Sequence, residues 1–126
     1  MKYYVPLVLL IAILLSACSQ PRPVNLNNVD STKVQIVFAQ LKGSESPFKT
    51  AVIDAIRIAY QDTAQIHVVS VKNTKDLSGV NADVLIVMDQ LKAGLYMNKG
   101  LKTFFTAADK DQTLYLITTG DEKWRY

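Results

Sequence analysis

The chain has 126 residues, a length that suits one domain, and a formal net charge of +3. Lysines alternate with acidic residues along the sequence, whereas a nucleic-acid binder should show clustered basic residues, so we expect no nucleic-acid partner. The single cysteine and single histidine exclude a disulfide framework, a thiolate metal site and a multi-histidine metal site within one chain. We therefore expect no metal.

The first residues have the pattern of an export signal. Lys2 precedes an apolar run over 5–15, and the run ends in Leu15-Ser-Ala-Cys18. This run is too short to span about 30 Å of hydrocarbon, which requires about 20 helical residues. The final quartet resembles the lipobox of bacterial lipoprotein signals. The resemblance implies a signal peptide over 1–17, palmitate or similar acyl chains on Cys18, and a domain anchored outside the cytoplasm on the cell membrane or the outer membrane.

Residues 18–32 are rich in Pro, Asn, Gln and Ser, and they have little apolar surface to offset the entropy of ordering. We expect this segment to be a flexible tether, followed by one domain over 33–126. Removal of 1–17 removes only Lys2 among the charged residues, which leaves 13 basic and 11 acidic residues. This near-neutral balance is typical of a mixed, solvated surface.

A strand, a polar loop and a helix are expected between residues 34 and 61. Four of the six residues 34–39 are branched or aromatic, without strict alternation, which predicts a strand buried on both faces. Ser46 is expected to cap a helix that begins at Pro47 and ends at Gln61. The predicted core face of this helix is Phe48, Val52, Ile56, Ala59 and Tyr60, while Lys49, Asp54, Arg57 and Gln61 lie elsewhere.

The remaining elements alternate in the same way. Strands are expected over 65–72, 82–88 and 113–119, and the connection over 73–81 has at most one helical turn. Asn98 is expected to cap a second helix whose core face is Leu101, Phe104, Phe105 and Ala108. Alternating strands and helices predict an α/β fold with a parallel sheet and right-handed crossovers. With the first strand in the middle, the strand order is 2-1-3-4 and each face receives one helix.

This pattern resembles the flavodoxin-like fold over residues 33–124. The resemblance is carried by the strand and polar loop at 34–46, the run at 82–87, the helix start at 98–105 and the turn at 116–121. The pattern contains no fifth strand or closing helix, so we expect a fold that is incomplete at its C-terminus or a sheet with an open edge.

The family implies flavin mononucleotide (FMN) beyond the carboxyl ends of the first and third strands. The corresponding loops are 40–46, 89–97 and 119–124, and the residues that would bind the cofactor are Lys42, Gly43, Ser44, Ser46, Tyr96, Thr119, Gly120 and Trp124. The first loop departs from the family's Thr/Ser-x-Thr-Gly-x-Thr phosphate loop. Glu45 would also place a carboxylate beside the phosphate. We therefore expect a flavin-free binding module, with FMN-dependent electron transfer as the alternative.

A second resemblance gives another alternative. Small domains of periplasm-facing lipoproteins that regulate envelope machinery share the lipobox, the Pro/Asn tether and a Thr-Gly-Asp-Glu-x-Trp turn, here at 119–124. That resemblance implies function by protein–protein binding. The residues give no sign of side-chain catalysis, because no Gly-x-Ser-x-Gly occurs and the only histidine, His67, lies in an expected strand.

Overall fold

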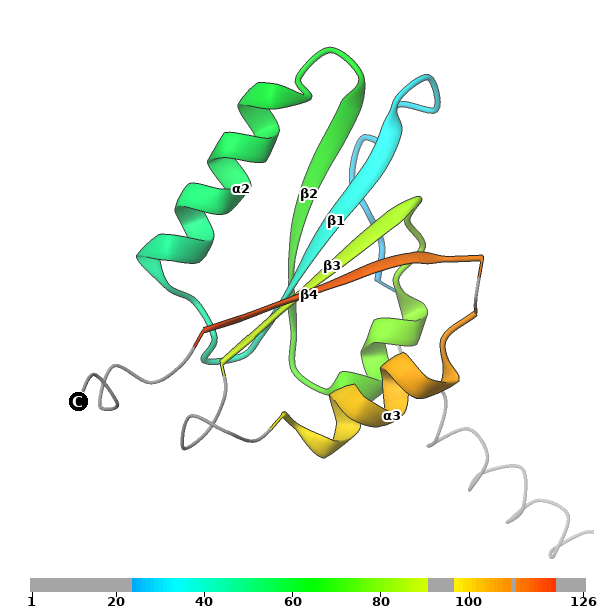
Figure 1. The fold of residues 1–126 in the computed structure, drawn as a ribbon. Coiled ribbons are helices and arrows are strands. Elements are labelled where there is room, and N and C mark those ends of the chain that lie inside the picture. The colour runs from blue at the N-terminus through cyan, green and yellow to red at the C-terminus, as the bar shows by residue number, and fades with distance from the viewer. Residues whose placement is uncertain (1–23, 91–96, 110, 120–126) are drawn as a thin grey trace, which may run out of the picture.

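The computed structural model describes residues 24–90, 97–109 and 111–119. Within these residues the strands β1 (Val34–Leu41), β2 (Ala64–Val71), β3 (Val84–Gln90) and β4 (Thr113–Thr119) form one parallel sheet in the order β2-β1-β3-β4 (Figure 1). The predicted α/β class, the flavodoxin-like arrangement and the strand order are confirmed. No helix in this part of the chain is long and apolar enough to cross a membrane.

The middle of the sheet is buried on both faces. The side chains of Val37, Phe38 and Ala39 in β1 are fully buried, as are those of Leu85 and Val87 in β3. A strand covered on both sides needs apolar residues at consecutive positions instead of alternate ones. This requirement explains why the run in β1 lacks strict alternation.

Helix α2 (Pro47–Ala59) covers one face of the sheet (Figure 1). The Ser46 hydroxyl accepts a hydrogen bond from the Lys49 backbone N–H at 3.2 Å, and Pro47 is the first helical residue, so the predicted helix start is confirmed. The helix ends two residues before the predicted Gln61. The buried residues of this face, named here the α2-side core, are Ile36, Phe38, Ile53, Ala64, Ile86 and Met88.

The predicted core face of α2 is partly wrong. Val52 and Ile56 pack against the core as predicted, but Phe48 is 60% exposed, Tyr60 is 52% exposed and Ala59 is also exposed. The inward face is completed by Ile53 and by Lys49, whose side chain is fully buried. Apolar residues occupy a wide arc of this helix, so residue spacing alone is consistent with a buried face that includes Phe48 or with one that includes Lys49. In the structure, the face that includes Lys49 packs on the sheet.

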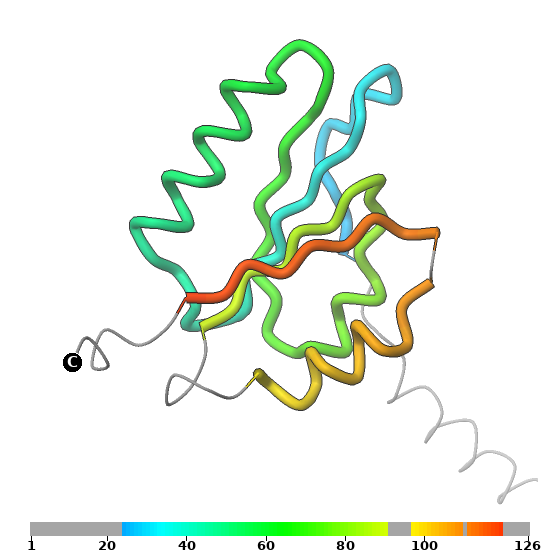
Figure 2. The backbone as a smooth tube through the Cα atoms, in the orientation of Figure 1, coloured from blue at the N-terminus to red at the C-terminus, as the bar shows by residue number. Residues whose placement is uncertain are grey.

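The opposite face is covered by two helical elements, the 3-10 helix η1 (Thr74–Gly79) and helix α3 (Lys99–Ala107), which lie side by side (Figure 2). The helical turn in the connection after β2 and the cap of α3 are confirmed, because the Asn98 side-chain oxygen accepts the Gly100 N–H at 2.8 Å. The α3-side core comprises Val37, Ala39, Leu41, Val71, Leu77, Val80, Leu85, Val87 and Leu101, with Phe104 and Phe105 packed against it.

Gly100 sets the distance between α3 and η1. A Cβ atom built on Gly100 would collide with the Oγ1 of Thr74 and would lie 2.9 Å from its Cβ. A side chain at position 100 would therefore force the two elements apart. The close packing of this face depends on the absence of a side chain there.

Residues 24–32, which the sequence predicts to be part of a flexible tether, lie against the domain. Val24 forms a parallel bridge with Val80, and its N–H donates to the Gly79 carbonyl at 3.2 Å. Val24 and Leu26 pack against the α3-side core, and the Asp30 N–H donates to the Gln65 side chain at 2.7 Å. The segment is poor in apolar residues, but two partly buried ones and these hydrogen bonds hold it against the domain.

Candidate functional site

The candidate site lies at the carboxyl ends of β1 and β3, where the strand order reverses. The chain leaves β1 toward α2 on one face of the sheet, and after β3 it reaches α3 on the other face (Figure 1). Ligands of open α/β sheets bind at such a switch point. Strand β1 continues through Leu41, so the first loop is 42–46, two residues shorter than predicted.

The first loop directs its polar groups inward. The Ser44 side chain is buried, its hydroxyl donates to the Met88 carbonyl at 3.0 Å, and its N–H donates to the Leu41 carbonyl at 2.9 Å. The Lys42 N–H donates to the Val71 carbonyl at 3.1 Å. Gly43 has φ +81°, a conformation that favours glycine. Ser44 therefore ties the loop to β3 instead of presenting its hydroxyl to a ligand.

The residue that sequence reasoning missed is Lys49. Its ammonium group donates to the Ser44 carbonyl and to the Asp89 carbonyl, the latter at 2.7 Å. One side chain from the first turn of α2 thus joins the loop after β1 to the end of β3. We name this arrangement the Lys49 bridge, formed by Lys49, Ser44 and Asp89.

Burial is the dominant influence on the Lys49 ammonium. Desolvation lowers its pKa, and the negative charges of Asp89 and, to a smaller extent, Glu45 oppose that effect. The Asp89 side chain is also buried. The bridge therefore places a cation and a carboxylate at the switch point, in a part of the protein that water barely reaches.

The N-terminus of α2 has few donors left for a phosphate. Pro47 has no N–H, the Lys49 N–H donates to the Ser46 hydroxyl, and the Thr50 N–H donates to the Ser46 carbonyl. Ser46, predicted to bind the cofactor, thus serves as the helix cap. These contacts fit a closed structural junction and do not fit a phosphate cradle.

The other predicted site residues are placed only in part. Thr119 is the last residue of β4 and pairs with Gln90 of β3. Cys18, Tyr96, Gly120 and Trp124 lie outside the described residues, as do the predicted signal peptide and most of the second loop. The ring Nε2 of His67 in β2 lies 2.8 Å from the side-chain oxygen of Gln35 in β1. No group of three potential metal ligands occurs among the described residues.

A signal for Lys49 was present in the sequence. Lys49, Val52, Ile53 and Ile56 follow the three- and four-residue spacing of a helical face as well as the predicted set does. A lysine on such a face near a helix N-terminus can reach carbonyl groups at the end of a neighbouring strand. Because Phe48 is apolar and Lys49 is charged, the sequence favoured the helix face that includes Phe48 as the buried one.

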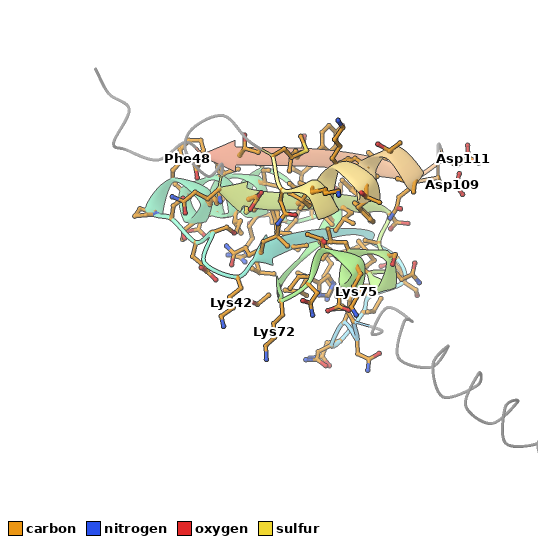
Figure 3. The ribbon with its side chains drawn as sticks, turned by 90° about the horizontal axis from the view of Figure 1, so that it is seen from below. Lys42, Phe48, Lys72, Lys75, Asp109 and Asp111 are labelled. Atoms are coloured by element: carbon orange, nitrogen blue, oxygen red, sulfur yellow. The ribbon has the colours of Figure 1, made fainter. Side chains whose placement is uncertain are left out.

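Several apolar side chains remain exposed on the α2 side of the sheet. Ile58 is 72% exposed on the helix, and Tyr115 is 57% exposed on β4. Figure 3 shows Phe48 near the end of β4. We name Phe48, Ile58 and Tyr115 the exposed apolar set. Two of the three belong to α2 and the third to β4, so these are apolar side chains that a protein partner on the α2 side would contact.

No family model matches the chain, and neither the curated proteins nor the solved structures contain a match to it.

Proposed function

We propose that this protein is a lipid-anchored, non-catalytic binding module of the cell envelope. The observation that carries the proposal is the Lys49 bridge, which closes the switch point with side-chain and backbone contacts of the chain itself. The lipobox-like Leu15-Ser-Ala-Cys18 supports attachment to the membrane through Cys18. The anchor would hold the domain at the membrane surface, where it binds a protein partner.

The alternative is an FMN-binding electron-transfer protein, and the strand order is the observation in its favour. The first loop does not fit the phosphate of this cofactor, because the Ser44 and Ser46 hydroxyls are engaged within the protein. Glu45 adds a carboxylate to the same loop. We therefore derive no chemistry through a flavin.

A titration with FMN separates the two functions. The mature chain 18–126 with Cys18→Ser, and the same chain with Glu45→Thr, are added to FMN while the quenching of flavin fluorescence is recorded. We expect no quenching by either protein, because the Ser44 hydroxyl and the N–H groups of Ser44, Lys49 and Thr50 already have acceptors within the protein. Submicromolar binding by the protein that retains Glu45 would overturn the binding-module proposal and favour electron transfer.

The exposed apolar set is where we expect the protein partner to bind, as the envelope-regulator alternative also requires. A photo-crosslinking amino acid at position 58 should give one discrete adduct in intact cells. The matched control is the same amino acid at the exposed polar position Thr103 of α3, the helix on the opposite face of the sheet. Equal yields at both positions, or no adduct at position 58, would contradict this assignment.

A further inference from the structure

Three lysines that are distant in sequence gather at one end of the domain. Lys42 follows β1, Lys72 follows β2 and Lys75 lies in the first turn of η1, and all three are exposed. The hydrogen bond from the Lys42 N–H to the Val71 carbonyl places Lys42 beside Lys72. We name Lys42, Lys72 and Lys75 the basic face.

The basic face lies on the same side of the domain as the N-terminal segment. Figure 3 shows Lys42 and Lys72 pointing to the side of the domain where the N-terminal segment, drawn in blue, also lies, and it labels Lys75 on η1. Asp109 and Asp111 lie at the far end of the same view. Asp76 of η1 is buried, so its carboxylate adds little negative charge to this surface, and the exposed Glu45 leaves an excess of positive charge.

The N-terminal segment fixes how far the domain can stand from Cys18. Val24 is held against the domain by its bridge to Val80, immediately after η1. Five residues, 19–23, lie between Cys18 and Val24, so the chain takes six residue steps from one to the other. A fully extended chain spans about 3.3–3.6 Å per residue, so Val24 lies within roughly 20 Å of the lipidated position. A freely moving tether of 18–32 would have allowed a larger distance and every orientation.

We propose that the basic face docks on an anionic phospholipid surface, so that the anchored domain lies on the membrane in one orientation. This inference rests on the proposed attachment through Cys18. The exposed apolar set includes residues on the outer side of α2 and on β4, and docking would leave it open to a protein partner. The membrane would thus determine which surface of the module is presented.

The physical basis is electrostatic attraction over a short distance. A lysine near an anionic leaflet contributes about 1 kcal/mol, which corresponds to roughly a fivefold change in the docked population. The attraction decays within a Debye length of about 10 Å at 0.1 M salt, so the short tether is required for it to act. The acyl chains supply attachment, and the lysines supply orientation.

Lysine reactivity on vesicles tests this proposal. The lipidated protein is purified from membranes and inserted into vesicles of phosphatidylcholine alone or of phosphatidylcholine with phosphatidylglycerol. It is then acetylated, and mass spectrometry gives the rate at each lysine. The control is Lys102, which is exposed on α3 and lies outside the basic face. We expect slower acetylation of Lys42, Lys72 and Lys75 only on the anionic vesicles, and recovery of the rate at high salt.

A variant sharpens the same measurement. Lys42→Gln with Lys75→Gln should restore the acetylation rate of Lys72 on anionic vesicles, by about fivefold for each lysine removed. Equal rates on the two kinds of vesicle, or equal protection of Lys102, would overturn the docking proposal. Failure of the protein to float with either vesicle would instead contradict the lipid anchor, so the two failures are distinguishable.

Discussion

The two faces of the sheet are covered to different extents. Among the described residues, two helical elements and the segment that begins at Val24 enclose the nine buried residues of the α3-side core. In the same part of the chain, one helix covers the six buried residues of the α2-side core, and Tyr115 of β4 is exposed. The comparison shows that one face is closed by local packing, while the other keeps apolar surface that a partner can use.

The junction between the faces is polar, although both cores are apolar. The Lys49 bridge joins α2 to the ends of β1 and β3, at the edge where the two layers meet. A buried cation is costly unless it is hydrogen-bonded. Its position at this edge fixes the entry of α2 onto the sheet, and this junction distinguishes the module from an open cofactor site.

The largest effect is expected for Phe38→Ala in the α2-side core. Phe38 is fully buried in the central strand. Its loss leaves a cavity and should lower the free energy of unfolding by about 3–5 kcal/mol. Urea unfolding of the mature chain 18–126 with Cys18→Ser, followed by circular dichroism, measures the change. A loss below about 1 kcal/mol would mean that the half-covered face is loosely packed and can collapse around the cavity.

Gly100→Ala tests the close packing of the other face. The new methyl group would collide with Thr74, so α3 and η1 must separate, at a cost of roughly 1–3 kcal/mol. The double variant Gly100→Ala with Thr74→Ala removes the colliding hydroxyl and should recover part of the loss. If the single variant unfolds at the same urea concentration as wild type, the contact between the two elements is not tight.

The junction is tested by the pH dependence of Lys49→Met. Burial lowers the pKa of Lys49 in the folded protein below its ordinary value of 10.5, so above the folded pKa the unfolded chain binds more protons. The stability of wild type relative to Lys49→Met should therefore rise with pH above the folded pKa of Lys49 and level off above 10.5. A neutral amine still has two N–H donors for the two carbonyl groups. If the difference in stability between wild type and Lys49→Met stays constant or falls as the pH rises, the Lys49 ammonium is well solvated in the folded protein.

The smallest effect on stability is expected in the exposed apolar set. Phe48→Ser and Tyr115→Ser should each change the free energy of unfolding by less than about 0.5 kcal/mol, because both side chains are mostly exposed. The same urea titration measures both variants, and Ile53→Ser on the inner side of α2 is the destabilising control. A large loss of unfolding free energy for Phe48→Ser would mean that Phe48 belongs to the buried face of α2, as predicted from the sequence.

Much of the fold could be predicted because its signals are local. Apolar runs identified the strands, and Ser46 and Asn98 identified the two helix starts, since a cap needs only its own side chain and the next turn. The strand order followed from the handedness of crossovers and the reach of the connection over 73–81. The expectations for Cys18 and the signal peptide rest on the first eighteen residues and stay predictions.

The sequence by itself determined the elements, their order in the sheet and the loop that follows β1. Tertiary structure decided that Lys49 is buried while Phe48 is exposed, because the choice between two overlapping helix faces depends on the carbonyl groups at the end of β3. It also decided that Val24 lies against Val80 and that Lys42, Lys72 and Lys75 share one surface. These contacts join residues that are far apart in the chain, and local propensity carries no information about them.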